Sequence, residues 1–364
     1  MYGAQLIEAM RHRDPSLQFF GVGGDRMRAA GCDTVVEAKD LAVVGITEIL
    51  SHLPKIWGLF HRLIAEADTR RPDLVVVIDS PAFNWRVARQ MRKRSIPVVY
   101  YVCPQFWAWR QGRVKLLRKY VDKALVIFPF EEKFYRDRGV NAAFVGHPLA
   151  DLPRPQISRS DYAQQHDLNP AKPWISVMPG SRRKEVCMNL PGILESVAKL
   201  GSGHEFLVPV ASTLDRAWMQ QQLQGLNVHL VPESLPALAH SRAGIIASGT
   251  ATVEAALMEL PFVMVYRVSP LTYFLGKPRV KIPHFAMVNL IAGKEVVPEL
   301  VQHDFTGDKV VALLAQLVAE SPARAKMLNE LRDVRLKLAG NLPFGIHPAD
   351  RAAEMTLSLL HSKS

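Results

Sequence analysis

Short apolar runs alternate with helical segments along most of this chain. Nine runs of five to seven residues are rich in Val, Ile, Leu and Phe, and segments with apolar residues at helical spacing follow them. Runs that are apolar at nearly every position are typical of parallel strands covered by helices on both faces. The pattern therefore predicts an α/β protein with doubly wound parallel sheets. The nine predicted strands are 19–23, 73–79, 96–102, 123–128, 174–178, 206–210, 226–231, 243–248 and 261–266.

A polar, Pro-rich stretch at 147–161 separates the first four runs from the last five. Linkers between domains commonly have this composition, and 364 residues suit two domains of ordinary size. We expect a first domain over 1–155, a second over 165–342, and a terminal helix in 343–364 that packs back on the first domain. Open parallel sheets bind ligands beyond the carboxyl ends of their strands, so we expect the two domains to face a common cleft.

The overall composition excludes several classes of protein. The chain is 48% hydrophobic and 22% charged, and its longest apolar stretches are far shorter than the ~20 residues of a membrane-spanning helix. The first residues lack the pattern of a secretory signal. The three cysteines, Cys32, Cys103 and Cys187, are too widely spaced for a disulfide framework or a zinc cluster. We expect a cytoplasmic protein.

The formal charge of +11 is concentrated in one window. Residues 86–123 contain eleven Lys or Arg and one acid, Asp122. Such a window attracts polyanions, which include nucleic acids, anionic lipids and phosphorylated substrates, or it is a set of solvated helix faces with no partner. Within it, Trp107 and Trp109 lie close to Arg110 and Arg113. Aromatic and cationic side chains in this order suit stacked bases, and they equally suit an interface between an acyl chain and a phosphate.

A helical stripe of apolar residues at 41–64 has two explanations. Core packing is the first, and docking onto a membrane or acyl chains is the second.

The first candidate catalytic residue is Asp79, which ends the predicted strand 73–79 where Ser80 and Pro81 open a helix. A carboxylate at the carboxyl end of a parallel strand can act as a general base. The alternative is that Asp79 only caps the following helix.

Two loops of the second half have the residues of a phosphate site. After the strand 174–178 come a Pro-Gly turn, Ser181, Arg182, Arg183 and Glu185. Backbone amides and a forked guanidinium both donate hydrogen bonds to a diphosphate, although a surface turn would have the same composition.

The strand 243–248 ends at Ser248, and Gly249 and Thr250 follow, with Glu254 one helical turn further on. Small residues allow a phosphate to approach the helix N-terminus, and Glu254 could accept hydrogen bonds from ribose hydroxyls. A simple helix cap explains the same residues.

Several familiar motifs are absent. GVGGDR at 21–26 has Arg26 where the dinucleotide fingerprint requires glycine, and the chain has neither a phosphate-binding P-loop nor the Gly-x-Ser-x-Gly motif of hydrolases. It also has no Asp-x-Asp pair. These absences disfavour metal-dependent sugar-nucleotide chemistry, so arginines and helix dipoles would have to stabilise a leaving group.

Taken together, these segments resemble the lipid-A-disaccharide synthase family, whose motifs they match in order from residue 2 to about residue 300. The matching segments are VVGITEIL (43–50), IDSPAFN (78–84), YYVCPQFWAWRQGRVK (100–115), FPFEEKFY (128–135), VGHPLAD (145–151), PGSRRKEV (179–186), ASGTATVE (247–254) and VNLIAGKEVVPEL (288–300).

The resemblance implies a GT-B fold of two Rossmann-like domains, with UDP bound mainly by the second and no metal or redox cofactor. The implied reaction joins UDP-2,3-diacylglucosamine to 2,3-diacylglucosamine 1-phosphate (lipid X) at the inner face of the inner membrane, with no nucleic acid involved; a homodimer is left open. By position, Asp79 matches the general base, Arg182 the arginine at the diphosphate, and Asn289 a further position near the donor. Ser248, Gly249, Thr250 and Glu254 match the nucleotide-binding loop. On this resemblance we expect Ser181, Arg183 and Glu185 to bind the UDP-sugar as well. We expect the phosphorylated, acylated acceptor to be held at the membrane face by Trp107, Trp109, Arg110 and Arg113.

The chain departs from the family pattern in two places. Family members begin with a strand and a Gly-Glu-x-Ser-Gly-Asp loop before the helix that opens here at residue 2, so we expect either an upstream start or an impaired product. Ala82 replaces an Asp that some members have. Three alternatives to a synthase remain: another UDP-sugar enzyme of the same fold, such as a UDP-N-acetylglucosamine 2-epimerase; an RNA-binding protein; and an inactive remnant.

Overall fold

The computed structural model describes residues 1–41, 46–276, 282–340 and 346–362. The chain divides into two compact units, one formed by Met1–Pro148 with Ala339–Ser364 and the other by Leu149–Leu338. Within the described residues, no helix has both the length and the apolar character needed to cross a membrane.

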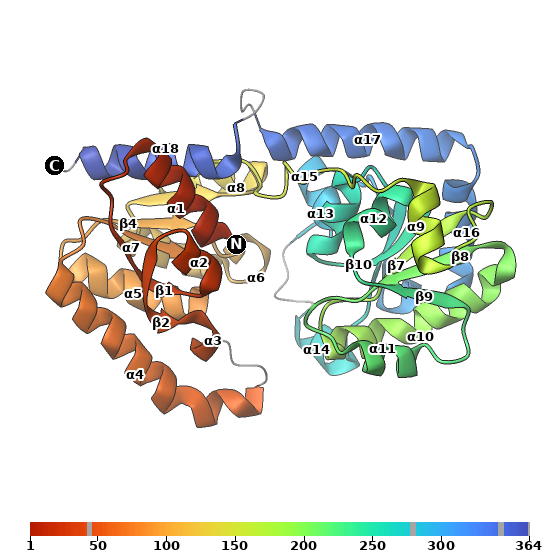
Figure 1. The fold of residues 1–364 in the computed structure, drawn as a ribbon, viewed down its shortest axis with the longest axis horizontal. Helices are drawn as coiled ribbons and strands as arrows, with labels where there is room; N and C mark the ends of the chain where they lie inside the picture. The colour runs from red at the N-terminus through yellow and green to blue at the C-terminus, as the bar shows by residue number, and fades with distance from the viewer. Residues whose placement is uncertain (42–45, 277–281, 341–345, 363–364) are drawn as a thin grey trace. The chain divides into compact units, whose positions relative to one another are not determined.

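In the first unit, six described strands form two separate parallel sheets (Figure 1). β1 pairs with β2, and β3, β4, β5 and β6 follow one another in the second sheet. In the described part of the chain, β1 and β3 therefore each have one edge without a neighbouring strand. β3 is partly exposed, whereas every residue of β4 is buried. The strands are β1 Phe19–Gly23, β2 Cys32–Glu37, β3 Val75–Ile78, β4 Val98–Tyr101, β5 Lys123–Val126 and β6 Ala142–Phe144.

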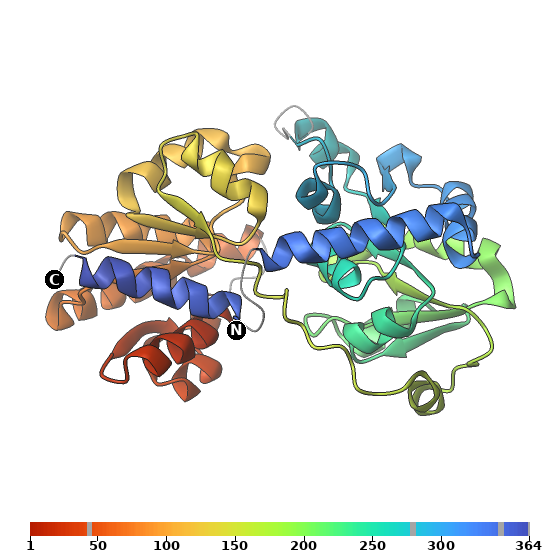
Figure 2. The ribbon, with the colours of Figure 1, turned by 90° about the horizontal axis from the view of Figure 1, so that it is seen from above.

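Helices connect these strands, because parallel neighbours cannot be joined by a tight turn. α5 packs on β3 and β4, and α7 packs on α5. The last helix, α18, lies along α1 in both views of the ribbon (Figures 1 and 2). The helices of this unit are α1 Tyr2–Arg13, α2 Asp25–Ala29, α3 Ala38–Leu41, α4 Ile46–Arg70, α5 Pro81–Lys93, α6 Phe106–Trp109, α7 Val114–Tyr120, α8 Pro129–Arg136 and α18 Pro348–His361.

The second unit has one six-stranded parallel sheet in the order β12-β11-β10-β7-β8-β9. Its first strand, β7, pairs with both β8 and β10, so the direction of winding reverses there and the loops after β7 and β10 become neighbours. Such a reversal is where open α/β sheets bind ligands. The strands are β7 Trp174–Met178, β8 Glu205–Pro209, β9 Val228–Val231, β10 Ala243–Ala247, β11 Phe262–Tyr266 and β12 Glu299–Val301.

Helices cover both faces of this sheet. α10 and α11 lie on one side of it and α12 and α13 on the other (Figure 1). The helices are α9 Arg159–His166, α10 Arg183–Leu200, α11 Arg216–Gln222, α12 Ser234–His240, α13 Thr250–Leu257, α14 Pro270–Gly276, α15 Met287–Ala292, α16 Gly307–Val318 and α17 Pro322–Ala339.

The predicted α/β class with parallel sheets is confirmed. All nine predicted strands are present, with ends within two residues of the predicted ones. The strands β2, β6 and β12 were not predicted.

Candidate active site

The turn after β3 holds Asp79 in an unusual conformation. Asp79 and Ser80 have φ angles of 48° and 42°, in the left-handed region that costs roughly 1–2 kcal/mol for residues other than glycine. The Nδ2 group of Asn84 donates to the carbonyls of Ile78 (2.8 Å) and Asp79 (2.7 Å), and the Tyr100 hydroxyl donates to that of Asp79 at 2.7 Å. These three hydrogen bonds stabilise a turn that the chain alone would not favour.

The carboxylate of Asp79 is exposed, and no hydrogen bond or ion pair to it occurs in the part of the chain that the structure describes. Ser80 is the N-cap residue of α5, and no side-chain cap is present at this helix. The alternative in which Asp79 only caps the helix is therefore wrong. A carboxylate at a strand end that has no hydrogen-bond or ion-pair partner can accept a proton from a substrate.

If Asp79 is the general base that the resemblance implies, replacing Asn84 with alanine should lower turnover about 10- to 100-fold, because small displacements of a catalytic group are costly. The KM for the sugar donor should stay the same. The matched control is Asn141→Ala, which also removes a side-chain bond to a carbonyl of the first unit, that of Asp122. Steady-state kinetics of the two variants check this, and equal losses in both would show that Asn84 has no special role.

The two tryptophans of the basic window 86–123 have different environments. Trp107 is buried, and its Nε1 donates to Glu131 Oε1 at 2.8 Å. Trp109 is 50% exposed, with the Arg110 guanidinium 4.0 Å from its ring centroid. The expectation that Trp107 contacts the acceptor or the membrane is corrected, because its side chain packs in the core. Trp109, Arg110 and Arg113 are exposed and remain available for that role.

Glu131 is a buried carboxylate that connects three segments of this region by hydrogen bonds. Besides Trp107 it accepts hydrogen bonds from the amides of Ile127 (3.2 Å) and Phe128 (3.0 Å) through Oε2. It thereby joins the end of β5, the start of α8 and the α6 segment that carries Trp109. Glu131 lies three residues after the N-cap Phe128, and its carboxylate accepts from the N-cap amide. Because phenylalanine has no side-chain acceptor, the sequence lacks the Ser/Thr-x-x-Glu pattern of a capping box and gave no signal for this residue.

Burial raises the pKa of Glu131 from 4.5 to about 7, although hydrogen bonds from Trp107 and two amides oppose the rise. Since the pKa is raised, its contribution to the free energy of unfolding is complete below about pH 4.5 and is lost as the pH rises through about 7. Over that interval the unaltered protein should lose about 3 kcal/mol relative to Glu131→Gln, which does not titrate. Urea unfolding of both proteins across this range measures the difference, and parallel curves would contradict the prediction.

The loop after β7 presents Arg182. Gly180 has φ 133°, and a Cβ added there would lie 2.8 Å from the Cβ of Glu185, so the turn requires glycine. Glu185 accepts from the amide of Ser181 at 3.2 Å and from Arg182 Nη1 at 2.8 Å. The Arg182 side chain is nevertheless 79% exposed, and among the described residues its guanidinium bonds only to Glu185, so most of its five N–H donors are unused there.

Two neighbours predicted to bind the sugar nucleotide are engaged within the protein. Both carboxylate oxygens of Glu185 are used in the turn itself. The Arg183 guanidinium lies 5.1 Å from the ring centroid of Trp218. Glu185 therefore orients Arg182, while Arg183 lies against α11.

The loop after β10 has the free amides that an anion needs. Gly249 has φ 140° and is the N-cap of α13, which has no side-chain cap. The amides of Thr250 and Ala251 donate to no other described residue. Unpaired amides at a helix N-terminus are typical of phosphate sites.

Glu254 lies one turn into the same helix. It accepts a hydrogen bond from the Ser234 hydroxyl at 3.0 Å, and burial raises the pKa of its carboxyl.

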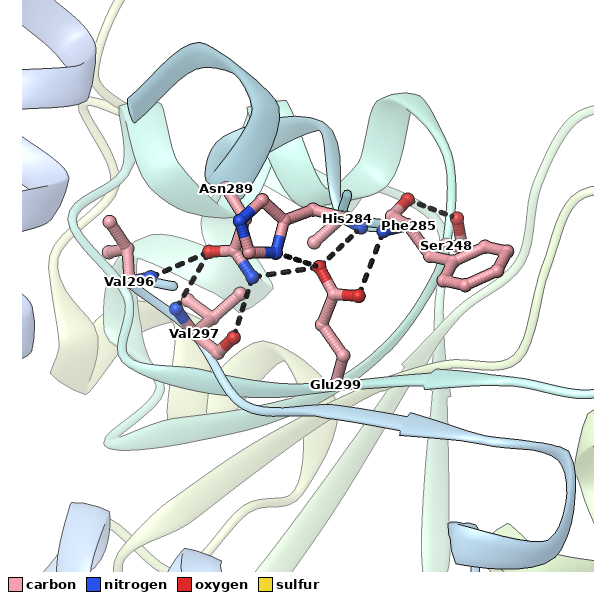
Figure 3. Close-up of polar contacts among 8 residues, drawn as sticks. Ser248, His284, Phe285, Asn289, Val296, Val297 and Glu299 are labelled. Carbon is pink, nitrogen blue, oxygen red and sulfur yellow. Dashed lines mark hydrogen bonds and ion pairs between the residues drawn. The ribbon is translucent and has the colours of Figure 1, made fainter. Parts of the chain in front are cut away.

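Asn289 does not face an open space. It is fully buried, and its amide makes four contacts: Nδ2 donates to Val297 O and Glu299 Oε1, both at 2.8 Å, and Oδ1 accepts from the amides of Val296 (2.7 Å) and Val297 (3.0 Å) (Figure 3). An amide side chain has no further capacity. The resemblance implied that Asn289 lies near the donor. In the structure its side chain has no hydrogen-bonding capacity left for a ligand and instead holds the backbone of Val296 and Val297.

Comparisons with known proteins address the family and the fold of the chain. A family model described as lipid-A-disaccharide synthetase matches residues 1–340. The chain is 52% identical to a lipid-A-disaccharide synthase of Koribacter versatilis, over 100% of this chain and 96% of that protein, and 46% identical to one of Acidobacterium capsulatum, over 93% and 88%.

Similar solved structures show the same fold at low identity. The calicheamicin glycosyltransferase CalG4 has a TM-score of 0.60 at 18% identity, covering 99% of this chain and 95% of that one. A putative UDP-N-acetylglucosamine 2-epimerase of Listeria monocytogenes has a TM-score of 0.62 at 12% identity, covering 99% and 92%. The fold is thus GT-B-like. From the family match and the identities over its whole length, the chain belongs to the lipid-A-disaccharide synthase family.

Proposed function

We propose that this chain is the glycosyltransferase that transfers the sugar of UDP-2,3-diacylglucosamine to the 6-hydroxyl of 2,3-diacylglucosamine 1-phosphate. The products are the β-1,6-linked disaccharide 1-phosphate of lipid A assembly and UDP. The observation that carries the proposal is family membership over the whole chain, together with the exposed carboxylate of Asp79 on its strained turn.

In the proposed mechanism Asp79 accepts the proton of the acceptor's 6-hydroxyl. The resulting oxygen attacks C1 of the donor sugar on the face opposite UDP, and the bond between C1 and the phosphate oxygen breaks. Attack from the opposite face inverts the anomeric centre and gives the β linkage. UDP departs with the electron pair of that bond.

The second unit supplies the donor site in this proposal. Arg182 and the free amides of Thr250 and Ala251 stabilise the negative charge that grows on the diphosphate, because charge-assisted hydrogen bonds strengthen as charge develops. The half-buried carboxyl of Glu254 accepts from ribose hydroxyls. These groups suit a nucleoside diphosphate better than a simple phosphate.

The acceptor is both acylated and phosphorylated, and the first unit offers residues for each part. Arg110 and Arg113 would attract its phosphate, and Trp109 would lie at the boundary between phosphate and acyl chains. In α4, Phe60 is buried while Trp57 is 58% exposed, so the stripe contributes to the core and still presents an aromatic side chain. The stripe residues at 46–53 lie outside the described side chains. We place the protein at the inner face of the inner membrane, bound peripherally.

The purified protein should convert the two acylated substrates to disaccharide 1-phosphate, detected by mass spectrometry, and should be inactive on unacylated UDP-N-acetylglucosamine. Epimerisation of the unacylated sugar nucleotide, with no disaccharide formed, would favour the 2-epimerase alternative instead. Tight binding of RNA with steep salt dependence and no binding of UDP would favour the nucleic-acid alternative.

A further inference from the structure

Glu299 is a largely buried carboxylate of the second unit that the proposed mechanism does not use. It lies on β12, and its side chain is 12% exposed. Oε2 accepts from the amide of Phe285 at 2.8 Å, and Oε1 accepts from the amide of Ala286 at 2.9 Å and from Asn289 Nδ2 at 2.8 Å (Figure 3). The Nδ1 atom of His284 lies 3.8 Å from Oε1. One carboxylate therefore fixes the backbone that leads into α15.

The same backbone contacts the loop after β10. The Ser248 hydroxyl donates to the carbonyl of Phe285 at 2.9 Å (Figure 3). A hydroxyl has a single hydrogen to donate, so in this arrangement Ser248 has none left for a phosphate. Ser248 instead ties the turn at Gly249 to residue 285, and residue 285 is tied to Glu299.

Only a carboxylate satisfies the three donors that converge on this position. Glutamine has the same shape but offers a single acceptor oxygen, and its NH2 group would face an N–H donor. Removing one partner of a buried hydrogen bond costs more than the bond contributes, because the other partner stays unsatisfied.

We propose that Glu299 is a positioning residue for the diphosphate of the sugar nucleotide, acting through the Phe285 peptide and the Ser248 hydroxyl on the Gly249 turn. The inference rests on the proposed function, because it assumes that UDP binds at the amides of Thr250 and Ala251. Glu299 itself does not contact the ligand. It fixes where those amides point.

The test is UDP affinity by isothermal titration calorimetry on the full chain. Glu299→Gln should weaken UDP binding about tenfold, the effect of losing one charge-assisted hydrogen bond. The matched control is Glu205→Gln, which alters another buried carboxylate of this unit. Glu205 lies on β8 and forms ion pairs with His229 and Lys172. Glu205→Gln should lower the melting temperature but leave UDP affinity within about twofold of the unaltered protein.

A double-mutant cycle separates positioning from general destabilisation. Ser248→Ala breaks the last link alone and should also weaken UDP binding about tenfold. If Glu299 acts through Ser248, the double variant should bind UDP no more weakly than Glu299→Gln. Additive losses in the cycle would overturn the inference, as would unchanged affinity in Glu299→Gln.

Further outcomes distinguish a failure of the inference about Glu299 from a failure of the proposed function. If Glu299→Gln fails to fold, Ser248→Ala still tests the inference. Unchanged UDP affinity in Ser248→Ala would show that the bond from Ser248 to Phe285 does not position the UDP site. Failure of the unaltered protein to bind UDP would count against the proposed function itself. Binding by the unaltered protein with no change in these variants would count against Glu299 alone.

Discussion

Replacing Asp79 with asparagine is expected to lower turnover at least ~10²-fold, the usual contribution of a general base. Asparagine keeps the shape of the side chain but cannot accept the acceptor's proton. Because the Asp79 carboxylate has no partner in the described residues, this substitution breaks no hydrogen bond or ion pair that the structure shows. The free energy of unfolding should therefore change little. Single-turnover measurements with both substrates isolate the chemical step.

The control for Asp79 is Asp73→Asn. Asp73 is also exposed, and it lies just before the same strand, at the amino end of β3, where parallel sheets do not place catalytic groups. Its substitution should leave turnover within about twofold of the unaltered protein. Near-normal turnover in Asp79→Asn would remove Asp79 as the base.

The second large effect is expected at Arg182. Its substitution by alanine should lower kcat/KM for the sugar nucleotide about 10²-fold, because removing one stabilising donor from a developing anion typically costs this much. Arg182→Lys keeps the charge but loses the forked pair of donors, and it should retain an intermediate activity. The melting temperature should hardly change, since the Arg182–Glu185 pair is exposed and such pairs contribute little.

An exposed arginine elsewhere in the second unit serves as its control. Arg332 forms an ion pair with Glu259 at 3.0 Å and takes no part in the donor loops. Arg332→Ala should leave kcat/KM unchanged. Equal losses in Arg182→Ala and Arg332→Ala would mean that the Arg182 effect reflects overall charge and not contact with a diphosphate.

The strands that the sequence predicts most clearly are those that are apolar and buried at every position. β10 is apolar along its whole length and buried at every position, so its pattern is unambiguous. The strands that were missed lack this property: β6 and β12 have three residues each, and β2 has exposed and half-buried positions among its buried ones. Their strand character depends on pairing with β5, β11 and β1, which the local sequence does not specify.

The candidate site was predictable only to the level of position along the chain. The strand-end rule located Asp79, Arg182 and Ser248, because parallel strands bring their carboxyl ends to one edge of a sheet. It did not indicate that Trp107 is buried or that all the hydrogen-bonding groups of the Asn289 side chain are used within the protein. Trp107 is held by Glu131, which lies 24 residues away in sequence. Asn289 is saturated by the backbone of Val296 and Val297 together with Glu299, and the local sequence does not specify these contacts.

The central claim is a division of roles, with the base in the first unit and the UDP site in the second. Titrating UDP into the unaltered protein, Asp79→Asn and Arg182→Ala tests it most directly. Asp79→Asn should bind UDP within about twofold of the unaltered protein, and Arg182→Ala should bind at least about tenfold more weakly. The claim would be contradicted if Asp79→Asn lost UDP affinity as severely as Arg182→Ala, or if Arg182→Ala bound UDP normally.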